Sequence, residues 1–132
     1  MPIKVKRIKP EFIDARGFIS RIIDQKKIPI RSILIISSKA KSVRGDHYHK
    51  KDSHYVYCLS GKLKYSSRDI QSSSKKIDSV VLVPGDLVFT KPLHWHSMEF
   101  LEDTVFLAFT TETRQHNKYE ADTIREKKFI DI

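Results

Sequence analysis

Short runs of strand-forming residues recur along this chain at near-regular intervals, and turn signals separate them. The runs are 12–24, 31–40, 54–69, 80–90 and 103–113. Every glycine falls at a turn between or within such runs: Gly17, Gly45, Gly61 and Gly85. Short strands separated by turns at near-regular intervals predict an all-β sandwich or barrel. The serine-rich stretch 70–76 has little apolar surface to bury, so we expect it to form a loop.

The length of the chain fits one domain. A chain of 132 residues is long enough to bury its own core, so we assign residues 1–132 to a single domain. The only cysteine, Cys58, allows no internal disulfide, and its apolar run YVYCLS predicts a buried thiol rather than a reactive one. Neither a signal-like apolar segment nor a run of about 20 apolar residues is present. We therefore expect a cytoplasmic protein with no membrane partner.

The chain is strongly basic, with a formal net charge of +9. An excess of positive charge of this size can serve to bind an anionic partner. The basic residues are scattered in short pairs among acidic ones, and no nucleic-acid-binding motif accompanies them. We therefore expect no nucleic-acid partner. A solvated lysine-rich surface and a cleft for a phosphate-bearing small molecule both remain compatible with the charge.

Five of the six histidines lie between positions 47 and 96. His47 and His49 are two residues apart, so on a strand they point to the same face. The turn KKDS lets His54 face them from the next strand, and His96 arrives from a later one. Four neutral imidazoles suit Zn, Fe, Mn, Ni or Cu, whereas Mg and Ca prefer oxygen ligands. Three interpretations stay open: a metal site made by these four histidines, a metal-free acid/base pair, and a structural role.

The order of these residues resembles the two sequence motifs of the cupin superfamily. The matching positions are Gly45, His47, His49, His54, Gly61, Pro84, Gly85, Pro92 and His96. This resemblance covers both halves of the chain and implies a double-stranded β-helix, a jelly-roll barrel. The chain departs from the motifs where His54 replaces the usual glutamate and His94 a frequent glycine. The spacings before His47 and at His96 also differ.

Read from end to end, the chain resembles the dTDP-sugar 3,4-ketoisomerases of the FdtA/WxcM-like type. It is more distantly similar to the RmlC-like dTDP-4-dehydrorhamnose 3,5-epimerases. The residues that carry the resemblance are Asp14-x-Arg16-Gly17, Arg44-Gly45-x-His47-x-His49-Lys50, CLSG, PLHWHSMEF and the tail NKYEADTIREKKFI.

This resemblance implies an isomerase or epimerase of a nucleotide-linked 4-keto-6-deoxy sugar in surface polysaccharide biosynthesis. His47 and His49 would be the catalytic acid/base pair, because an imidazole with its ordinary pKa of about 6.5 titrates near neutral pH. Arg16 and Arg44 would bind the diphosphate, and Lys50 would add a third positive charge. A bound metal would assist as a Lewis acid.

Two departures keep a second function class open. The ketoisomerases carry a tyrosine in the strand before the histidine pair, where this chain reads RSILIISS, and a glutamine or similar residue at the position of His54. The alternative is a metal-binding cupin that is not a sugar enzyme, either an oxygenase or a sensing and binding module. The end-to-end similarity favours the sugar isomerase.

The two ends of the chain carry further expectations. The resemblance implies a homodimer that exchanges N-terminal strands, and MPIKVKRIKP has the alternation needed to join a neighbouring sheet. The charged tail from Thr113 to Ile130 contains no Gly or Pro, which allows either a short helix or an extended arm.

Overall fold

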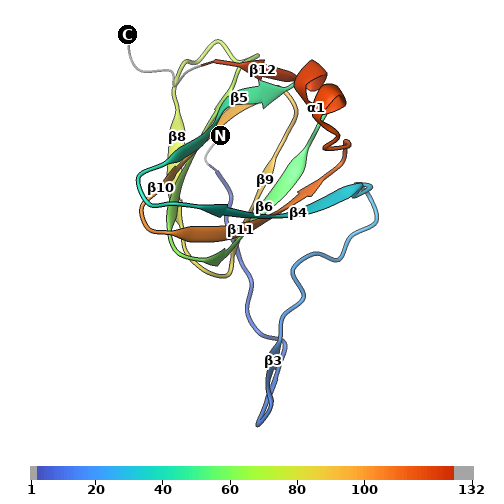
Figure 1. The fold of residues 1–132 in the computed structure, drawn as a ribbon, viewed down its shortest axis with the longest axis vertical. Helices are drawn as coiled ribbons and strands as arrows, with labels where there is room; N and C mark the ends of the chain where they lie inside the picture. Colours follow the sequence, from blue (N-terminus) through green and yellow to red (C-terminus); the bar gives the residue numbers. More distant parts are fainter. Residues whose placement is uncertain (1–2, 127–132) are drawn as a thin grey trace.

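Two antiparallel five-stranded sheets close into a barrel in the computed structural model, which describes residues 3–126 (Figure 1). One sheet has the order β1 (Lys6–Arg7), β9 (Asp86–Thr90), β6 (His54–Ser60), β11 (Thr104–Thr110) and β4 (Ser32–Ser38). The other has the order β12 (Thr123–Arg125), β5 (Val43–His49), β10 (His94–Phe100), β7 (Leu63–Asp69) and β8 (Asp78–Leu82). The predicted all-β jelly-roll barrel is confirmed.

The hydrophobic core lies between the two sheets because alternate strand residues point inward. In β11, Phe106 and Ala108 are buried while their neighbours are partly exposed. The core cluster contains Val56, Cys58, Leu63, Tyr65, Leu82, Val88, Met98, Phe100, Phe106 and Ala108. Cys58 is fully buried, and burial raises the pKa of its thiol to about 11. The expectation of an unreactive strand thiol is therefore confirmed.

The loop after β7 confirms one expectation, and the C-terminal tail decides an open one. Residues 70–77 form the predicted loop between β7 and β8. The tail combines both alternatives, because α1 (His116–Asp122) is a short helix and β12 follows it as an extended strand. β12 pairs with β5, placing Thr123 opposite His49 and Arg125 opposite His47. The last part of the predicted tail, residues 127–132, lies outside the described residues.

The N-terminal segment pairs within its own chain. Lys6 and Arg7 of β1 lie opposite Leu87 and Asp86 of β9, and the Arg7 guanidinium binds the buried Asp86 carboxylate at 2.7 Å. The expected exchange of N-terminal strands involves a second chain and stays a prediction. Its first two residues lie outside the described part of the chain.

A hairpin made by β2 (Phe12–Asp14) and β3 (Gly17–Ile19) extends away from the barrel (Figure 1). Its large apolar side chains are mostly exposed: Phe12 53%, Ile13 71%, Phe18 67% and Ile19 63%. Nothing in the described part of the chain covers them.

Gly45 lets β5 pass close to β10 beside His96. Its φ is +91°, and a Cβ there would lie 2.8 Å from the main-chain oxygen of His96. The pairing of β10 with β5 shifts register at this point, between His96 and Ser97. The glycine therefore allows the irregularity that orients His96.

We expect Gly45→Ala to lower the free energy of unfolding by about 1–3 kcal/mol, because positive φ and the close approach are both unfavourable for alanine. Urea unfolding followed by circular dichroism measures the change. Gly17→Ala is the matched control, since Gly17 also has positive φ but an added Cβ meets nothing within 4 Å. An equal effect of both substitutions would contradict the importance of the close approach.

Candidate active site

Four histidines from three strands converge inside one end of the barrel. His47 and His49 come from β5, His54 from β6 and His96 from β10. The ring centroids of His47 and His49 are 4.7 Å apart, those of His47 and His96 also 4.7 Å, and those of His54 and His96 5.0 Å. All four side chains are buried. The spatial convergence expected from strand parity is present, and we call these four residues the imidazole cluster.

The cluster lines a cavity of about 570 Å³. Its apolar wall includes Leu34 and Ile36 from β4, the strand that the resemblance would have given a tyrosine. A phenol is nevertheless present on another wall, because Tyr119 of α1 also lines the cavity. The Tyr119 ring lies 5.4 Å from that of His49, and the Arg114 guanidinium lies 4.5 Å from the Tyr119 ring.

The ring of His49 has one nitrogen held and the other free. Its Nδ1 lies 3.2 Å from the Thr123 hydroxyl oxygen. That hydroxyl donates its hydrogen to the Tyr119 carbonyl at 2.7 Å, so it accepts from Nδ1. Nε2 of neutral His49 then carries a lone pair, and this atom is buried without a hydrogen-bond partner. A neutral imidazole with a free lone pair facing its neighbours is a candidate base or metal ligand.

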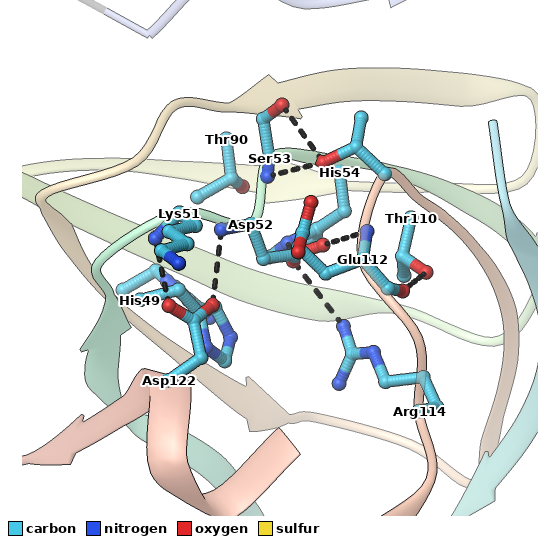
Figure 2. A network of polar contacts seen from close by, with 12 residues as sticks. His49, Lys51, Asp52, Ser53, His54, Thr90, Thr110, Glu112, Arg114 and Asp122 are labelled. Atoms are coloured by element: carbon cyan, nitrogen blue, oxygen red, sulfur yellow. Dashed lines mark hydrogen bonds and ion pairs between the residues drawn. The ribbon is translucent and has the colours of Figure 1, made fainter. Parts of the chain in front are cut away.

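His54 is oriented by the buried carboxylate of Asp52. Its Nδ1 donates to Asp52 at 3.0 Å, which leaves its Nε2 as an acceptor. Asp52 also accepts from the main-chain N–H of Glu112 at 3.1 Å and lies 3.7 Å from Arg114 (Figure 2). Burial tends to raise the pKa of Asp52, but the contacts with His54 and Arg114 outweigh it and lower that pKa. The carboxylate therefore stays ionised.

His96 and His47 have opposite hydrogen-bond environments. The Nδ1 of His96 donates to the His94 carbonyl at 3.3 Å, which leaves Nε2 as an acceptor. The Nδ1 of His47 instead lies 3.5 Å from Nη1 of Arg125, a group that can only donate. Neutral His47 therefore carries its hydrogen on Nε2. The cavity thus holds an imidazole whose Nε2–H can donate a hydrogen bond, His47, beside one whose Nε2 can accept, His49.

Burial keeps the cluster uncharged at neutral pH. Burial, followed by the neighbouring His49 and Arg125, lowers the pKa of His47 to about 3. Burial and the neighbouring His54 lower the pKa of His49 to about 4. The pKa values of His54 and His96 are also lowered, mainly by burial. The expectation of a pKa near 6.5 for His47 and His49 is therefore wrong, because the sequence pattern does not reveal how deeply they are buried.

The three basic residues predicted to bind substrate lie in three different places. Arg44 lines the cavity of the imidazole cluster, and its guanidinium donates to the Ser38 hydroxyl at 2.7 Å. Lys50 lines an adjacent depression rather than the same cavity. Arg16 lies on the β2–β3 hairpin, where it pairs with Asp14 at 2.7 Å. Of these three residues, one chain alone therefore brings only Arg44 to the cavity of the histidines.

Sequence reasoning missed the side chains that the segment 114–125 brings to the cluster. These are Arg114, Tyr119, Thr123 and Arg125. Thr123 and Arg125 alternate on β12 opposite His49 and His47, which is a strand signal of only three residues. Nothing in so short a pattern indicates that it pairs with β5.

The arrangement of neutral donor and acceptor imidazoles, with cations at the rim, suits proton transfer to and from a small anionic substrate.

A sequence model of the FdtA family, described as WxcM-like, C-terminal, matches residues 1–131. No helix of the described residues is long and apolar enough to cross a membrane. A search of curated protein sequences found no match.

Solved structures of sugar-nucleotide enzymes resemble this chain over most of its length. A double mutant of the QdtA 3,4-ketoisomerase from Thermoanaerobacterium thermosaccharolyticum, in complex with TDP, is 29% identical with a TM-score of 0.74, covering 94% of this chain and 87% of that one. A 3,4-ketoisomerase from Helicobacter canadensis is 21% identical with a TM-score of 0.77, covering 96% and 92%. The RmlC epimerase of Mycobacterium tuberculosis is 19% identical with a TM-score of 0.73, covering 83% and 62%.

Proposed function

Because the chain belongs to the FdtA family of WxcM-like, C-terminal proteins, we propose that it is an isomerase of a nucleotide-linked 4-keto-6-deoxy sugar that acts in surface polysaccharide biosynthesis. The observation that carries the proposal is the pairing of His49, whose buried Nε2 has no partner, with His47, whose Nε2 bears a hydrogen. The similar ketoisomerase complexed with TDP supports a thymidine-diphosphate sugar as substrate. The comparisons do not favour the alternative of a metal-binding cupin unrelated to sugars.

The proposed reaction moves the carbonyl from C4 of the sugar to C3. Nε2 of His49 removes the proton from C3, and the electron pair forms the C3–C4 double bond while Nε2–H of His47 protonates the C4 oxygen. The resulting enediol then returns the proton of its C3 oxygen to Nε2 of His47 and takes the proton held on Nε2 of His49 at C4. Protons are only redistributed, so the reaction consumes no oxidant or reductant. Imidazoles are suited to both steps because the same ring can donate or accept a proton.

Arg44 is the proposed diphosphate ligand within the chain. A guanidinium offers paired donors to phosphate oxygens, and Arg44 reaches the cavity that holds His47 and His49. Arg125 adds a positive charge beside His47. We retain Lys50 as a more distant contributor at the neighbouring depression.

We propose a homodimer that covers the exposed apolar surface of the hairpin and of β4. Ile33 and Ile35 on the outer face of β4 are 69% and 71% exposed, and the hairpin side chains are similarly uncovered. A second copy of the chain removes this surface from water, which is favourable by roughly 25 cal/mol per Å². In such a dimer, the hairpin of one chain, which extends away from its own barrel, can bring Arg16 to the histidine cavity of the second chain.

Replacing Ile33 and Ile35 together by asparagine should convert the dimer to monomers. The outward side chains contribute only to the interface, so the thermal transition of the monomer should remain cooperative. Sedimentation velocity of wild type and variant measures the change. A wild-type protein that sediments as a monomer at micromolar concentration would contradict the dimer.

The pH dependence of the proposed activity follows from the buried imidazoles. His47 and His49 have pKa values of about 3 and 4, so both are neutral throughout the range from pH 6 to 8. The profile of kcat/KM reports groups of the free enzyme, and the base form of His49 is lost only as the pH falls through about 4. We expect kcat/KM to be nearly flat from pH 6 to 8. A fall of tenfold between pH 7 and 6 would contradict the assignment.

The direct test is incubation of the purified protein with TDP-4-keto-6-deoxyglucose, followed by proton NMR of the sugar. We expect a 3-keto product whose initial rate of formation increases in proportion to protein concentration. TDP-glucose, which lacks a carbonyl and therefore an acidified C–H, is the negative control. Recovery of unchanged keto sugar would contradict the proposed function.

A further inference from the structure

We propose that strand β12 assigns the two proton-transfer roles in the cavity: Thr123 fixes His49 as the base, and Arg125 fixes His47 as the proton donor. Both are positioning residues, because each acts through the histidine that lies opposite it. The assignment of these roles rests on the proposed function. The effect of the two residues on the imidazole tautomers does not depend on it.

The pairing of two strands places one polar side chain against each histidine. β12 pairs antiparallel with β5, so that Thr123 lies directly opposite His49 and Arg125 opposite His47. Directly opposite residues of an antiparallel pair have side chains on the same face, with Cβ atoms about 4.5–5.5 Å apart. Each histidine therefore meets its own partner at Nδ1, at 3.2 Å for Thr123 and 3.5 Å for Arg125.

The end of α1 makes the Thr123 hydroxyl an acceptor toward His49. Thr123 caps the C-terminal end of the helix, and its main-chain N–H bonds to the Glu120 carbonyl. The Tyr119 carbonyl instead accepts the hydrogen of the Thr123 hydroxyl, at 2.7 Å. A hydroxyl has one hydrogen, so only a lone pair remains for the His49 ring. His49 therefore carries its hydrogen on Nδ1 and keeps the lone pair of its buried Nε2.

Arg125 imposes the opposite tautomer on His47. A guanidinium carries only N–H donors, so Nδ1 of His47 offers its lone pair and the ring hydrogen lies on Nε2. Glu120 holds the guanidinium in place, because both carboxylate oxygens accept from Nη2, at 2.5 and 2.9 Å. The positive charge at Nδ1 also stabilises the negative charge that develops on His47 as its Nε2 gives a proton to the sugar.

The two histidines are otherwise similar. Both side chains lie on the same face of β5, both are buried, and burial lowers the pKa of both. The tautomer of a neutral imidazole decides whether the nitrogen that faces the cavity donates or accepts. Loss of a contact with β12 should therefore mix the tautomers of one ring, so that only a fraction of the molecules is ready to react.

Nitrogen NMR of protein with isotope-labelled histidines tests the tautomers directly, because the protonated and the lone-pair nitrogen of a neutral ring differ in chemical shift. In the wild type we expect the hydrogen on Nδ1 of His49 and on Nε2 of His47. Thr123→Val should mix the tautomers of His49 alone, and Arg125→Met those of His47 alone. The same tautomer at both histidines of the wild type, or an unchanged tautomer in either variant, would overturn the proposal.

The isomerase assay tests the role of Thr123. Thr123→Val should lower kcat about three- to tenfold, the change in population that one hydrogen bond supplies, with KM changed by less than twofold. Thr123→Ser keeps the hydroxyl and should retain at least half of the wild-type kcat.

Thr104→Val is the matched control for Thr123→Val. It also removes a buried hydroxyl that donates to a carbonyl, that of Glu102 at 2.8 Å, but Thr104 lies at the end of β11 opposite to the one that pairs with His54. It should change kcat by less than twofold. Equal kcat values for Thr123→Val and Thr104→Val would overturn the role of Thr123.

Arg125 needs a test that separates positioning from substrate binding. Arg125→Met should lower kcat by tenfold or more and change KM by less than threefold, because the side chain acts through His47. A diphosphate ligand would instead raise KM with little change in kcat, and that result would overturn the role of Arg125. Arg125→Lys keeps a positive charge that can only donate and should recover part of the lost kcat. Equal kcat values for the two variants would overturn this role as well.

Failure of the inference and failure of the proposed function have different signatures. If the wild-type protein leaves the keto sugar unchanged, the roles of base and proton donor are wrong, and the NMR tautomers still decide whether β12 fixes the two rings. If the wild type isomerises the sugar but neither ring responds to Thr123→Val or Arg125→Met, the function stands and the inference about β12 is wrong.

Discussion

Replacing His49 by asparagine should lower kcat/KM for isomerisation by about 10³-fold, within the range of 10²–10⁴ that a positioned acid or base contributes. The substitution removes the free Nε2 lone pair of a buried ring that Thr123 holds in one orientation. Asparagine keeps an amide able to contact Thr123 but has no group that accepts a proton at neutral pH. Proton NMR of the keto sugar and its product measures the rate.

Two controls separate a lost base from a lost fold. His116→Asn changes a histidine of the same cavity that is not in the cluster, and the rate should fall by less than threefold. The thermal transition of His49→Asn should remain cooperative. A loss of less than tenfold in the His49 variant would mean that another group removes the proton.

Acidification from pH 7.5 to 5.5 should lower the free energy of unfolding of the metal-free protein by about 2–3 kcal/mol or more. The four cluster histidines have folded-state pKa values below 6.5, those of His47 and His49 being about 3 and 4. In the unfolded chain they bind protons near pH 6.5, so the unfolded state holds more protons as the pH falls below that value. His47 and His49 then each cost roughly 1–1.5 kcal/mol at pH 5.5, and His54 and His96, whose pKa values are also lowered, add to the loss. The stability is complete above pH 6.5 and declines below it.

Urea unfolding at the two pH values, with EDTA present, measures this loss. His54→Gln removes one of the four titrating groups and should make the loss smaller, because burial also lowers the pKa of His54. This difference between wild type and variant is specific for the cluster, because other acid-sensitive groups remain in both proteins. A wild-type loss below about 1 kcal/mol would contradict the buried, neutral cluster.

The fold and the meeting of the histidines were predictable because both depend on local periodicity. Alternation in short runs gave the strands, and the turns between them limited the topology to a sandwich or barrel. His47 and His49 share a strand face by their spacing alone. The turn KKDS and the cupin motifs predicted that His54 and His96 join them. In the structure His96 comes from β10, beside β5, and His54 from β6 in the opposite sheet.

The rest has no sequence signal of its own. Thr123 meets His49 only because the distant strand β12 joins the edge of β5. Asp52 binds His54 by a local contact two residues away, but the sequence does not show that this carboxylate is buried against the ring. The pKa values of the histidines depend on burial, which residue type and spacing do not give. Arg16 was placed in the site by motif alone, but its hairpin extends away from the barrel, so its role depends on a second chain.

Solvent-deuterium incorporation tests the central claim most directly, because it detects the proton transfer itself. The protein is incubated with TDP-4-keto-6-deoxyglucose in deuterated water, and the recovered sugars are analysed by NMR and mass spectrometry. The account predicts deuterium at the ring carbons next to the carbonyl with wild-type protein and none above background with His49→Asn. Equal incorporation in both, or none in either, would contradict His49 as the base of a sugar isomerase.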